Sequence, residues 1–269
     1  MKHSPNSEAD TVIFLHIHKA AGTTLHRIIE RQYTPAAIWS FDEQHDFQEF
    51  QALSVAEKAQ IRMLRGHMIF GLHEMMPNPC TYFTLLRDPG ERVISFYNYI
   101  RRNPHHYHSE MIASQELSLG EYLETKTSTM MNNGQTRMLA GARQYDFPVG
   151  ECTDELLEAA KRNLRDWFAV VGLVERFDET LLLLQRAFGW RRMFYVRQNV
   201  AERRPTPGDL SAETLDLVRK HNALDLQLYQ YAKALFEAQL RQQGVWFSGR
   251  VRLFQLANRL LTRPVLQRG

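Results

Sequence analysis

Short runs of consecutive apolar residues recur along the chain and are separated by stretches in which apolar residues are spaced three and four apart. The runs are rich in β-branched and aromatic residues, and they lie at Thr11–Ile17, Ile61–Leu64, Tyr82–Leu86, Ala169–Val174 and Met193–Val196. Such runs are typical of buried strands, and Ile61–Leu64 is the weakest of them. Because helical patterns separate the runs, the sequence predicts an α/β fold of parallel βα units.

Several helical stretches begin with capping residues. Ser54 with Glu57, and Ser118 with Glu121, have the spacing of a capping box. The stretch Asp88–Glu91 places Asp at the N-cap, Pro at the first helical position and Glu two positions later. The apolar residues that follow fall on one side of a helix and are Val93, Phe96, Tyr97 and Ile100. Later helices are predicted over Glu179–Phe188, Ser211–His221 and Asp225–Gln243, the last two separated near Asn222.

The chain shows no internal repeat and no low-complexity linker, which favours one domain. We expect a disordered N-terminus over residues 1–10, a single domain over residues 11–249 and a basic amphipathic tail over residues 250–269. The tail carries five arginines and no acidic residue. A helix of this kind can lie on an anionic membrane surface. We favour the other interpretation, a terminal helix that packs on the domain and leaves its basic face in water.

The composition changes this picture only slightly. Of the 269 residues, 44% are hydrophobic, the net charge is +3 and the pI is about 8.9. This balance suits an anionic ligand but does not demand a nucleic acid. Cys80 and Cys152 lack metal-ligand spacing and are expected to be reduced thiols. Since the first ten residues lack an apolar signal core and no apolar run reaches the roughly 20 residues of a membrane span, we expect a cytoplasmic protein.

The stretch Phe14–Leu25, FLHIHKAAGTTL, begins as a buried strand and ends as the first turn of a helix. Such a turn presents unpaired N–H groups that attract anions, and small residues let a phosphate or sulfate approach them. The candidate anion ligands are Lys19, Ala20, Ala21, Gly22, Thr23 and Thr24. Lys19 precedes Gly22, whereas a Walker loop places its lysine after the last glycine and adds a magnesium-binding pair. The alternative is a plain turn with an exposed lysine.

A second strand runs into a capped helix at TLLRDPGERVISFYNYIRR, residues 84–102. Arg87 lies at the strand end, where open α/β sheets bind their ligands, and arginine suits bidentate recognition of phosphate. Ser95 lies two turns into the helix, near the same end if the helix folds back along the sheet. The alternative for Arg87 is an ion pair with Asp88 or Glu91.

With these motifs in this order, the sequence resembles the sulfotransferases that use 3′-phosphoadenosine 5′-phosphosulfate (PAPS). It looks closest to the branch of the heparan sulfate 2-O- and 6-O-sulfotransferases and their bacterial relatives. The 5′-phosphosulfate loop of that family is similar to residues 18–25, and its 3′-phosphate motif matches Arg87, Asp88, Pro89, Arg92, Ser95 and Tyr97. Further stretches that look familial begin at Arg65, Asn133, Gly172 and Asn222, so the resemblance runs from about residue 11 to about residue 236.

The resemblance implies a three-layer P-loop-like fold with a central, mainly parallel sheet. It also implies transfer of a sulfuryl group from PAPS to an acceptor hydroxyl, which we expect on a carbohydrate or glycolipid, with release of adenosine 3′,5′-bisphosphate (PAP) and without a metal. Lys19 would stabilise the leaving phosphate, while Arg87 and Ser95 would hold the 3′-phosphate. Many relatives have Gly-Gly where this chain has Ala21-Gly22. The resembled Golgi enzymes carry a membrane anchor and disulfides that we do not find here, which puts their glycan substrates in doubt but not the chemistry.

The reaction needs a base, and histidine has a suitable pKa of about 6.5. The resemblance places a catalytic His or Glu near residues 65–74, where His67 is our first candidate, His73 the second and Glu74 the third. The alternative for His67 is a buried histidine bonded to backbone. We expect His16 to be structural and His18 to line the loop.

Further cationic and amide side chains are candidates for the cleft. Arg204, with Arg203 beside it, lies in a loop after the last predicted strand that can close over the 3′-phosphate or simply be solvated. Gln135 and Arg137 lie in the familial stretch NNGQTR and are plausible cleft residues.

Two other functions compete with a sulfotransferase. An ATP- and magnesium-dependent phosphotransferase should show a Walker Lys-Ser/Thr pair and a metal-binding carboxylate, and the sequence offers neither clearly. A non-catalytic protein that binds polyanions or membranes would depend on the arginine tail. The sequence does not indicate the oligomeric state.

Overall fold

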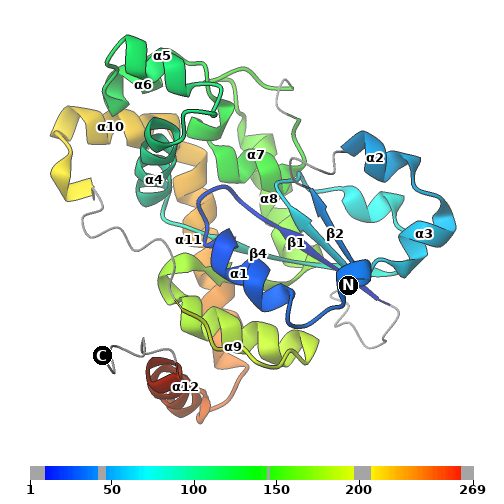
Figure 1. Cartoon of the computed structure of the whole chain (residues 1–269). Coiled ribbons are helices and arrows are strands. Elements are labelled where there is room, and N and C mark those ends of the chain that lie inside the picture. Colours follow the sequence, from blue (N-terminus) through cyan, green and yellow to red (C-terminus); the bar gives the residue numbers. More distant parts are fainter. Residues whose placement is uncertain (1–9, 42–46, 144–145, 197–206, 262–269) are drawn as a thin grey trace, which may run out of the picture.

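A five-stranded parallel sheet forms the centre of the molecule, with the strand order β2-β3-β1-β4-β5 (Figure 1). The structure is a computed structural model, and it describes residues 10–41, 47–143, 146–196 and 207–261. The strands are β1 (Thr11–Leu15), β2 (Ile38–Phe41), β3 (Met63–Gly66), β4 (Cys80–Leu86) and β5 (Phe168–Leu173). Every pairing between neighbouring strands is parallel. The predicted α/β fold with a parallel sheet is therefore confirmed.

Strand β1 is the middle strand, and all five of its residues are buried. It pairs with β3 on one side and with β4 on the other, and Phe14 lies opposite Arg65 and Phe83 in these pairings. A parallel strand covered on both faces reads as a continuous apolar run, which is why this strand is visible in the sequence.

The strands predicted from the sequence differ from those of the structure in two places. It missed β2, a four-residue edge strand whose residues are only half-buried. The strand predicted at Met193–Val196 is wrong, because this segment belongs to no strand. The backbone N–H and C=O of Tyr195 bond to the side-chain amide of Asn258, at 2.8 and 3.0 Å, rather than to a neighbouring strand.

Helices lie on both faces of the sheet. Figure 1 shows α1 (Gly22–Ile29) and α9 (Phe177–Phe188) in front of it, and α8 (Asp154–Trp167) and α11 (Ala223–Arg241) behind it. The remaining helices are α2 (Phe47–Ala52), α3 (Val55–Gln60), α4 (Pro89–Arg102), α5 (Ser109–Ser114), α6 (Leu119–Glu124), α7 (Gly134–Ala140), α10 (Ala212–His221) and α12 (Phe247–Leu261). This arrangement gives the three layers that the family resemblance implies.

A second, smaller core lies beside the sheet. It is made by α4, α5, α6 and α10, and its buried members include Val93, Phe96, Ile100, Leu119 and Val218. Figure 1 shows these helices as a group at the upper left, joined to the sheet through the chain that leaves β4. The capping residues predicted for α4 are found, since the Asp88 carboxylate accepts a hydrogen bond from the N–H of Glu91 at 3.1 Å.

The capping boxes predicted for α3 and α6 are also present, at Ser54 with Glu57 and at Ser118 with Glu121. The C-terminal helix α12 begins at Phe247, before the predicted tail, and residues 262–269 lie outside the described part. Residues 1–9 of the predicted disordered N-terminus lie outside it as well. Among the described residues, no helix has the length and apolarity that a membrane crossing requires.

Candidate functional site

The order in which the chain adds strands to the sheet reverses between β1 and β4. The chain leaves β1 toward β2 on one side, whereas β4 is followed by β5 on the other side. In open α/β sheets the crevice beyond the strand ends at such a point is where ligands bind. The two motifs singled out from the sequence leave the sheet at these two strand ends, and they meet: the Arg87 guanidinium Nη1 lies 3.4 Å from the carbonyl oxygen of Lys19.

The loop after β1 has an unusual backbone. Lys19 and Ala21 have φ angles of 66° and 61°, in the left-handed region that residues with a side chain seldom adopt. Ala21 is the N-cap of α1, and its side chain provides no capping hydrogen bond to the first-turn N–H groups. Alternating left- and right-handed residues before a helix form a concave anion site of backbone N–H groups. The left-handed conformation also explains why glycine would suit position 21.

Gly22 is required by close packing. A Cβ atom at this position would lie 1.8 Å from Cε1 of the His16 ring, which is buried beneath the turn. The turn can therefore approach the end of β1 only because residue 22 has no side chain.

Lys19 projects from this loop toward helix α4. Its Nζ lies 4.1 Å from the centroid of the Tyr99 ring, at a distance that gives a cation–π interaction. Thr23 is exposed and Thr24 half-buried in the first turn of α1, and Ala20 is buried. The predicted set of residues from Lys19 to Thr24 thus lies on one turn, with its positive charge and its hydroxyl groups at the carboxyl end of the sheet.

Arg87 makes the ion pair that the sequence analysis considered as an alternative. Its Nη2 lies 3.0 Å from the Glu91 carboxylate, one turn into α4, in addition to the contact with the Lys19 carbonyl. Ser95 is half-buried one helical turn beyond Glu91, on the same side of α4. Arg87 and Ser95 therefore flank Glu91 along one helix face that begins at the crevice.

His67 follows the end of β3, and its orientation is set by a backbone contact. Its Nδ1 lies 2.8 Å from the carbonyl oxygen of His16. Because a carbonyl oxygen only accepts hydrogen bonds, Nδ1 must carry the proton, and Nε2 keeps its lone pair. The ring stacks between His18, at 3.6 Å between centroids, and His16, at 4.2 Å. The hydrogen bond to backbone that we considered as the alternative for His67 is therefore present. It engages Nδ1 only and leaves Nε2 able to accept a proton.

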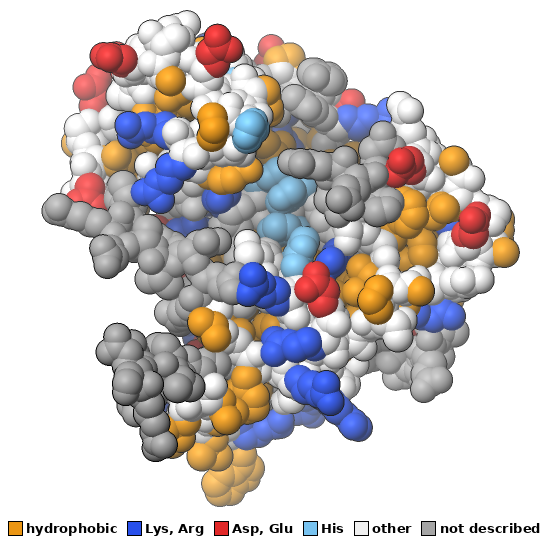
Figure 2. Space-filling model, in the orientation of Figure 1, with side chains coloured by type: hydrophobic (Ala, Val, Ile, Leu, Met, Phe, Trp, Pro, Cys, Tyr) orange, Lys and Arg blue, Asp and Glu red, His pale blue; other side chains and the backbone are white. Residues whose placement is uncertain are grey.

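Burial keeps this column of imidazoles neutral. It lowers the pKa of His18 to about 2 and the pKa of His16 well below its ordinary value. Burial also lowers the pKa of His67, against the opposing effect of the His16 carbonyl, and the positive charge of Lys19 lowers it further. The side chain of His67 is exposed at the surface, so the packing that lowers its pKa is that of the two rings that cover its faces. Figure 2 shows histidine side chains gathered in a hollow between the α4–α5 group and α1.

The second and third candidates for the base lie elsewhere. The Nδ1 of His73 lies 2.9 Å from the hydroxyl of Tyr82, and its ring lies 3.9 Å from that of Trp167. Tyr82 is near the start of β4 and Trp167 directly precedes β5, so His73 lies toward the amino end of the sheet. Glu74 is exposed in the same short turn. The structure does not bring either residue together with Lys19.

A buried polar network that the sequence analysis missed supports Arg87. Gln135 bonds to both the N–H and the C=O of Arg87. The Asp225 carboxylate in turn accepts hydrogen bonds from the N–H groups of Gln135 and Thr136 and lies 3.5 Å from the Arg92 guanidinium. The signal was present in the familial stretches that begin at Asn133 and Asn222, but the sequence did not indicate that they pair.

Two of the predicted cleft residues are not in the crevice as expected. Arg137 is buried, and its guanidinium bonds to the backbone carbonyls of Asn132, Phe147 and Pro148, so it holds the chain after α7 rather than facing a ligand. Gln135 is also buried and reaches the crevice only through the backbone of Arg87. Arg203 and Arg204 lie outside the described residues. Within the described residues, no group of three or more His, Cys, Asp or Glu side chains could hold a metal ion.

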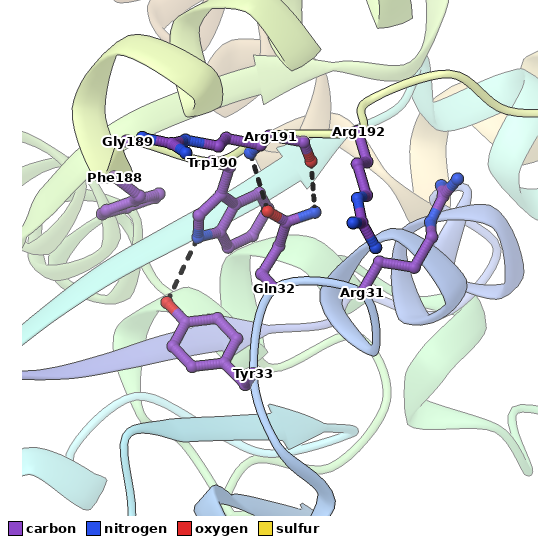
Figure 3. A pocket seen from close by; sticks show the side chains of 8 residues that line it. All are labelled: Arg31, Gln32, Tyr33, Phe188, Gly189, Trp190, Arg191 and Arg192. Carbon is purple, nitrogen blue, oxygen red and sulfur yellow. Dashed lines mark hydrogen bonds between the residues drawn. The ribbon is translucent and has the colours of Figure 1, made fainter.

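A separate cavity of about 370 Å³ opens between the ends of α1 and α9 (Figure 3). Gln32 bridges the backbone of Arg191, and Trp190 donates a hydrogen bond to the hydroxyl of Tyr33 at 3.2 Å. The cavity contains none of the predicted site residues. We therefore assign the site to the crevice at the β1 and β4 ends, where the charged and hydrogen-bonding groups converge.

Known proteins share this sequence pattern. A family model described as galactose-3-O-sulfotransferase matches residues 2–269. The galactose-3-O-sulfotransferase 3 of Bos taurus is 27% identical over an alignment of 260 positions, which covers 89% of this chain and 60% of that protein. The heparan-sulfate 6-O-sulfotransferase 1 of Homo sapiens is 27% identical over an alignment of 285 positions, with 85% of this chain and 66% of that protein covered. The protein of the same name from Cricetulus griseus is 30% identical over 187 residues, with 60% and 45% covered.

The chain spans about 60 to 66% of the length of the first two relatives. The sequence resemblance to sulfotransferases is confirmed, and relatives of both the galactose and the heparan sulfate type are found. Because the family model covers nearly every residue, the chain belongs to the galactose-3-O-sulfotransferase family.

Proposed function

We propose that this protein is a PAPS-dependent sulfotransferase that transfers a sulfuryl group to a hydroxyl of a carbohydrate acceptor. The observation that carries the proposal is the contact between Arg87 and the Lys19 carbonyl at 3.4 Å, since it joins a cationic anion-binding loop and a guanidinium at one crevice. A nucleotide with phosphate groups at both its 5′ and 3′ positions needs two such centres. The names of the relatives in both groups support a carbohydrate acceptor.

The donor set of the loop fits a 5′-phosphosulfate. Lys19 supplies a full positive charge, Thr23 and Thr24 supply hydroxyl donors, and the start of α1 supplies backbone N–H groups without a capping side chain. Bound PAPS supplies an activated sulfuryl group with a phosphate leaving group. The role of Lys19 and the helix start is to stabilise the negative charge that develops on that phosphate.

The 3′-phosphate would bind at Arg87 and Ser95. The guanidinium of Arg87 is already held by Glu91 at 3.0 Å, which keeps it at the strand end before a ligand arrives. This second centre would select PAPS over ATP, which has no 3′-phosphate. A role for Arg204 in covering the same group remains a prediction for a residue outside the described part.

His67 would act as the general base. Its Nδ1–H is occupied by the His16 carbonyl, so Nε2 is the nitrogen able to take the proton from the acceptor hydroxyl. The lowered pKa of His67 favours the unprotonated form of that nitrogen. His18 stacks on the ring and stays neutral because burial lowers its pKa to about 2, so it fixes the base without competing for the proton.

The acceptor would lie over an aromatic rim beside this base. Tyr99 and Tyr107 are 41% and 70% exposed, and the His106 ring lies between them at 5.9 and 4.5 Å. The faces of such rings are apolar while their edges are polar, which suits the two surfaces of a sugar ring. The rim begins next to the Nζ of Lys19, which lies over Tyr99.

Thermal unfolding with and without nucleotides tests the proposal. We expect PAP to raise the melting temperature without magnesium and in the presence of a chelator, and ATP with magnesium to leave it unchanged. Incubation with a radiolabelled sulfate donor and fractionated glycans should then label a carbohydrate fraction. Stabilisation by ATP with magnesium, but not by PAP, would instead indicate the phosphotransferase alternative.

Metal independence and a cytoplasmic location are part of the same proposal. The free thiols Cys80 and Cys152 are compatible with a reducing compartment. Cell fractionation tests the location, and transfer assays with and without a chelator test the need for a metal.

A further inference from the structure

Helix α12 has an apolar face that packs on the domain. Phe247 and Val251 are buried, and Phe254 stacks on Phe194 with ring centroids 5.5 Å apart. On the same side, the amide of Asn258 bonds to the backbone of Tyr195. The packing agrees with the interpretation that we favoured from the sequence, in which the terminal helix packs on the domain.

The opposite side of α12 carries a second apolar stripe in water. We define the outer stripe as Leu253, Leu256 and Leu260 of α12 together with Trp246 of the turn that precedes the helix. These four side chains are 68%, 56%, 60% and 83% exposed. At 100° per residue the three leucines fall within an arc of about 60°, opposite the packed face. A helix that needed only to pack on the domain would have polar residues there.

Positive charge lies beside the outer stripe. Arg252 and Arg259 are exposed along one of its edges, and Arg250 is exposed on the other flank. Neither Asp nor Glu occurs anywhere in residues 238–269, so no acid of this segment offsets the arginines. A tryptophan at one end of a leucine stripe with arginines beside it is the pattern of helices that lie in a membrane interface.

We infer that α12 docks this protein on an anionic lipid surface through the outer stripe, with the three arginines against lipid headgroups. The charge decides between the occupants. A second copy packed on the same stripe would bring two sets of arginines together, which is repulsive. An acidic glycan would pair with the arginines but would leave the leucines in water. An anionic bilayer satisfies both, because its headgroups carry the charge and its acyl chains accept the leucines.

Sedimentation of the full-length protein with vesicles tests this inference. The wild type should bind vesicles of phosphatidylcholine with phosphatidylglycerol, should bind pure phosphatidylcholine at least about tenfold more weakly, and should be largely released by about 0.5 M salt. The double variant Leu253→Asp and Leu256→Asp should lose more than about tenfold in binding. Arg252→Gln with Arg259→Gln should weaken binding to the anionic vesicles and flatten its salt dependence.

A matched control separates the stripe from a general effect of added charge. Val55 and Gln60 are exposed on α3, and Val55→Asp with Gln60→Asp, which adds the same two negative charges, should leave vesicle binding unchanged. All variants should keep the wild-type melting temperature, since the substituted side chains face water. The inference is overturned if the wild type does not bind anionic vesicles or if the leucine variant binds them as the wild type does. It is also overturned if the protein dimerises through the outer stripe and the leucine variant is a monomer.

Discussion

The side-chain amide of Gln135 forms two hydrogen bonds with the backbone of Arg87. Its Oε1 accepts a hydrogen bond from the Arg87 N–H at 3.0 Å, and its Nε2 donates one to the Arg87 carbonyl at 3.0 Å. The two residues are 48 positions apart in the sequence. This bidentate contact fixes the point at which β4 ends, and with it the origin of the guanidinium that faces the Lys19 loop.

Gln135→Leu should therefore weaken nucleotide binding although Gln135 is not expected to touch the ligand. We expect the affinity for PAP to fall about tenfold and the free energy of unfolding to fall by about 1–3 kcal/mol, because both backbone groups lose their partner. Gln135→Glu should not be milder, because it sets a carboxylate oxygen against the Arg87 carbonyl and buries a negative charge. Calorimetric titration with PAP and urea unfolding measure the two effects, and an unchanged PAP affinity in Gln135→Leu would contradict this role.

Lys19→Ala should lower the rate of sulfuryl transfer by about 100- to 1,000-fold, since it removes a preorganised positive charge at the leaving phosphate. Single-turnover kinetics at saturating donor measure the effect. The matched control is Lys58→Ala, which removes a half-buried lysine of α3 far from the β1 loop and should leave the rate unchanged. Equal effects of the two substitutions would rule out a specific role for Lys19.

His67→Ala should abolish most transfer while the affinity for PAP stays within about twofold. The lowered pKa of His67 sets the pH dependence of the wild type. A base works unprotonated, so kcat/KM should be constant above about pH 6.5 and fall only at lower pH, below the ordinary histidine pKa. A variant that keeps full activity would show that another group takes the proton.

The neutral histidine column should also make stability depend on pH. The folded state holds the pKa of His18 at about 2, whereas the unfolded chain titrates near 6.5. The unfolded state thus binds more protons below that pH, and the free energy of unfolding falls as the pH drops, by up to about 1.4 kcal/mol per pH unit for each such histidine. His18→Phe keeps a ring in the stack and should reduce the slope between pH 6 and 5 by about one proton in urea titrations. A slope equal to that of the wild type would refute the assignment.

Two neighbouring positions of the turn should respond oppositely to a change between alanine and glycine. Ala21→Gly relieves the left-handed strain at φ 61° and should stabilise the protein by about 1 kcal/mol. Gly22→Ala would place a Cβ atom inside the His16 ring. It should lower the free energy of unfolding by more than Ala21→Gly raises it, or prevent folding. Gly249→Ala is the control, since a Cβ there meets open space. Thermal unfolding of the three variants measures the effects, and a destabilised Ala21→Gly variant would contradict the strain argument.

Features contained in one contiguous stretch were predictable from the sequence, and features made by distant stretches were not. Both proposed anion-binding turns and the Asp88 cap lie within short segments, and the spacing of their residues determines the geometry. The Gln135 grip on Arg87 joins α7 to β4, and nothing local indicates it. Met193–Val196 has the composition of a strand, but Asn258 of α12 takes the backbone bonds of Tyr195. The separation of His67 from His73 likewise depends on which end of the sheet each reaches.

The central claim is that the β1 loop and Arg87 hold opposite ends of one nucleotide. Calorimetric affinities of PAP and of adenosine 5′-phosphate, for the wild type and for Arg87→Ala, test it most directly without magnesium. The account predicts that the wild type prefers PAP strongly and that Arg87→Ala loses this preference while it binds adenosine 5′-phosphate as the wild type does. If Arg87→Ala instead weakens both nucleotides equally, or leaves the preference for PAP intact, Arg87 does not read the 3′-phosphate and the account is wrong.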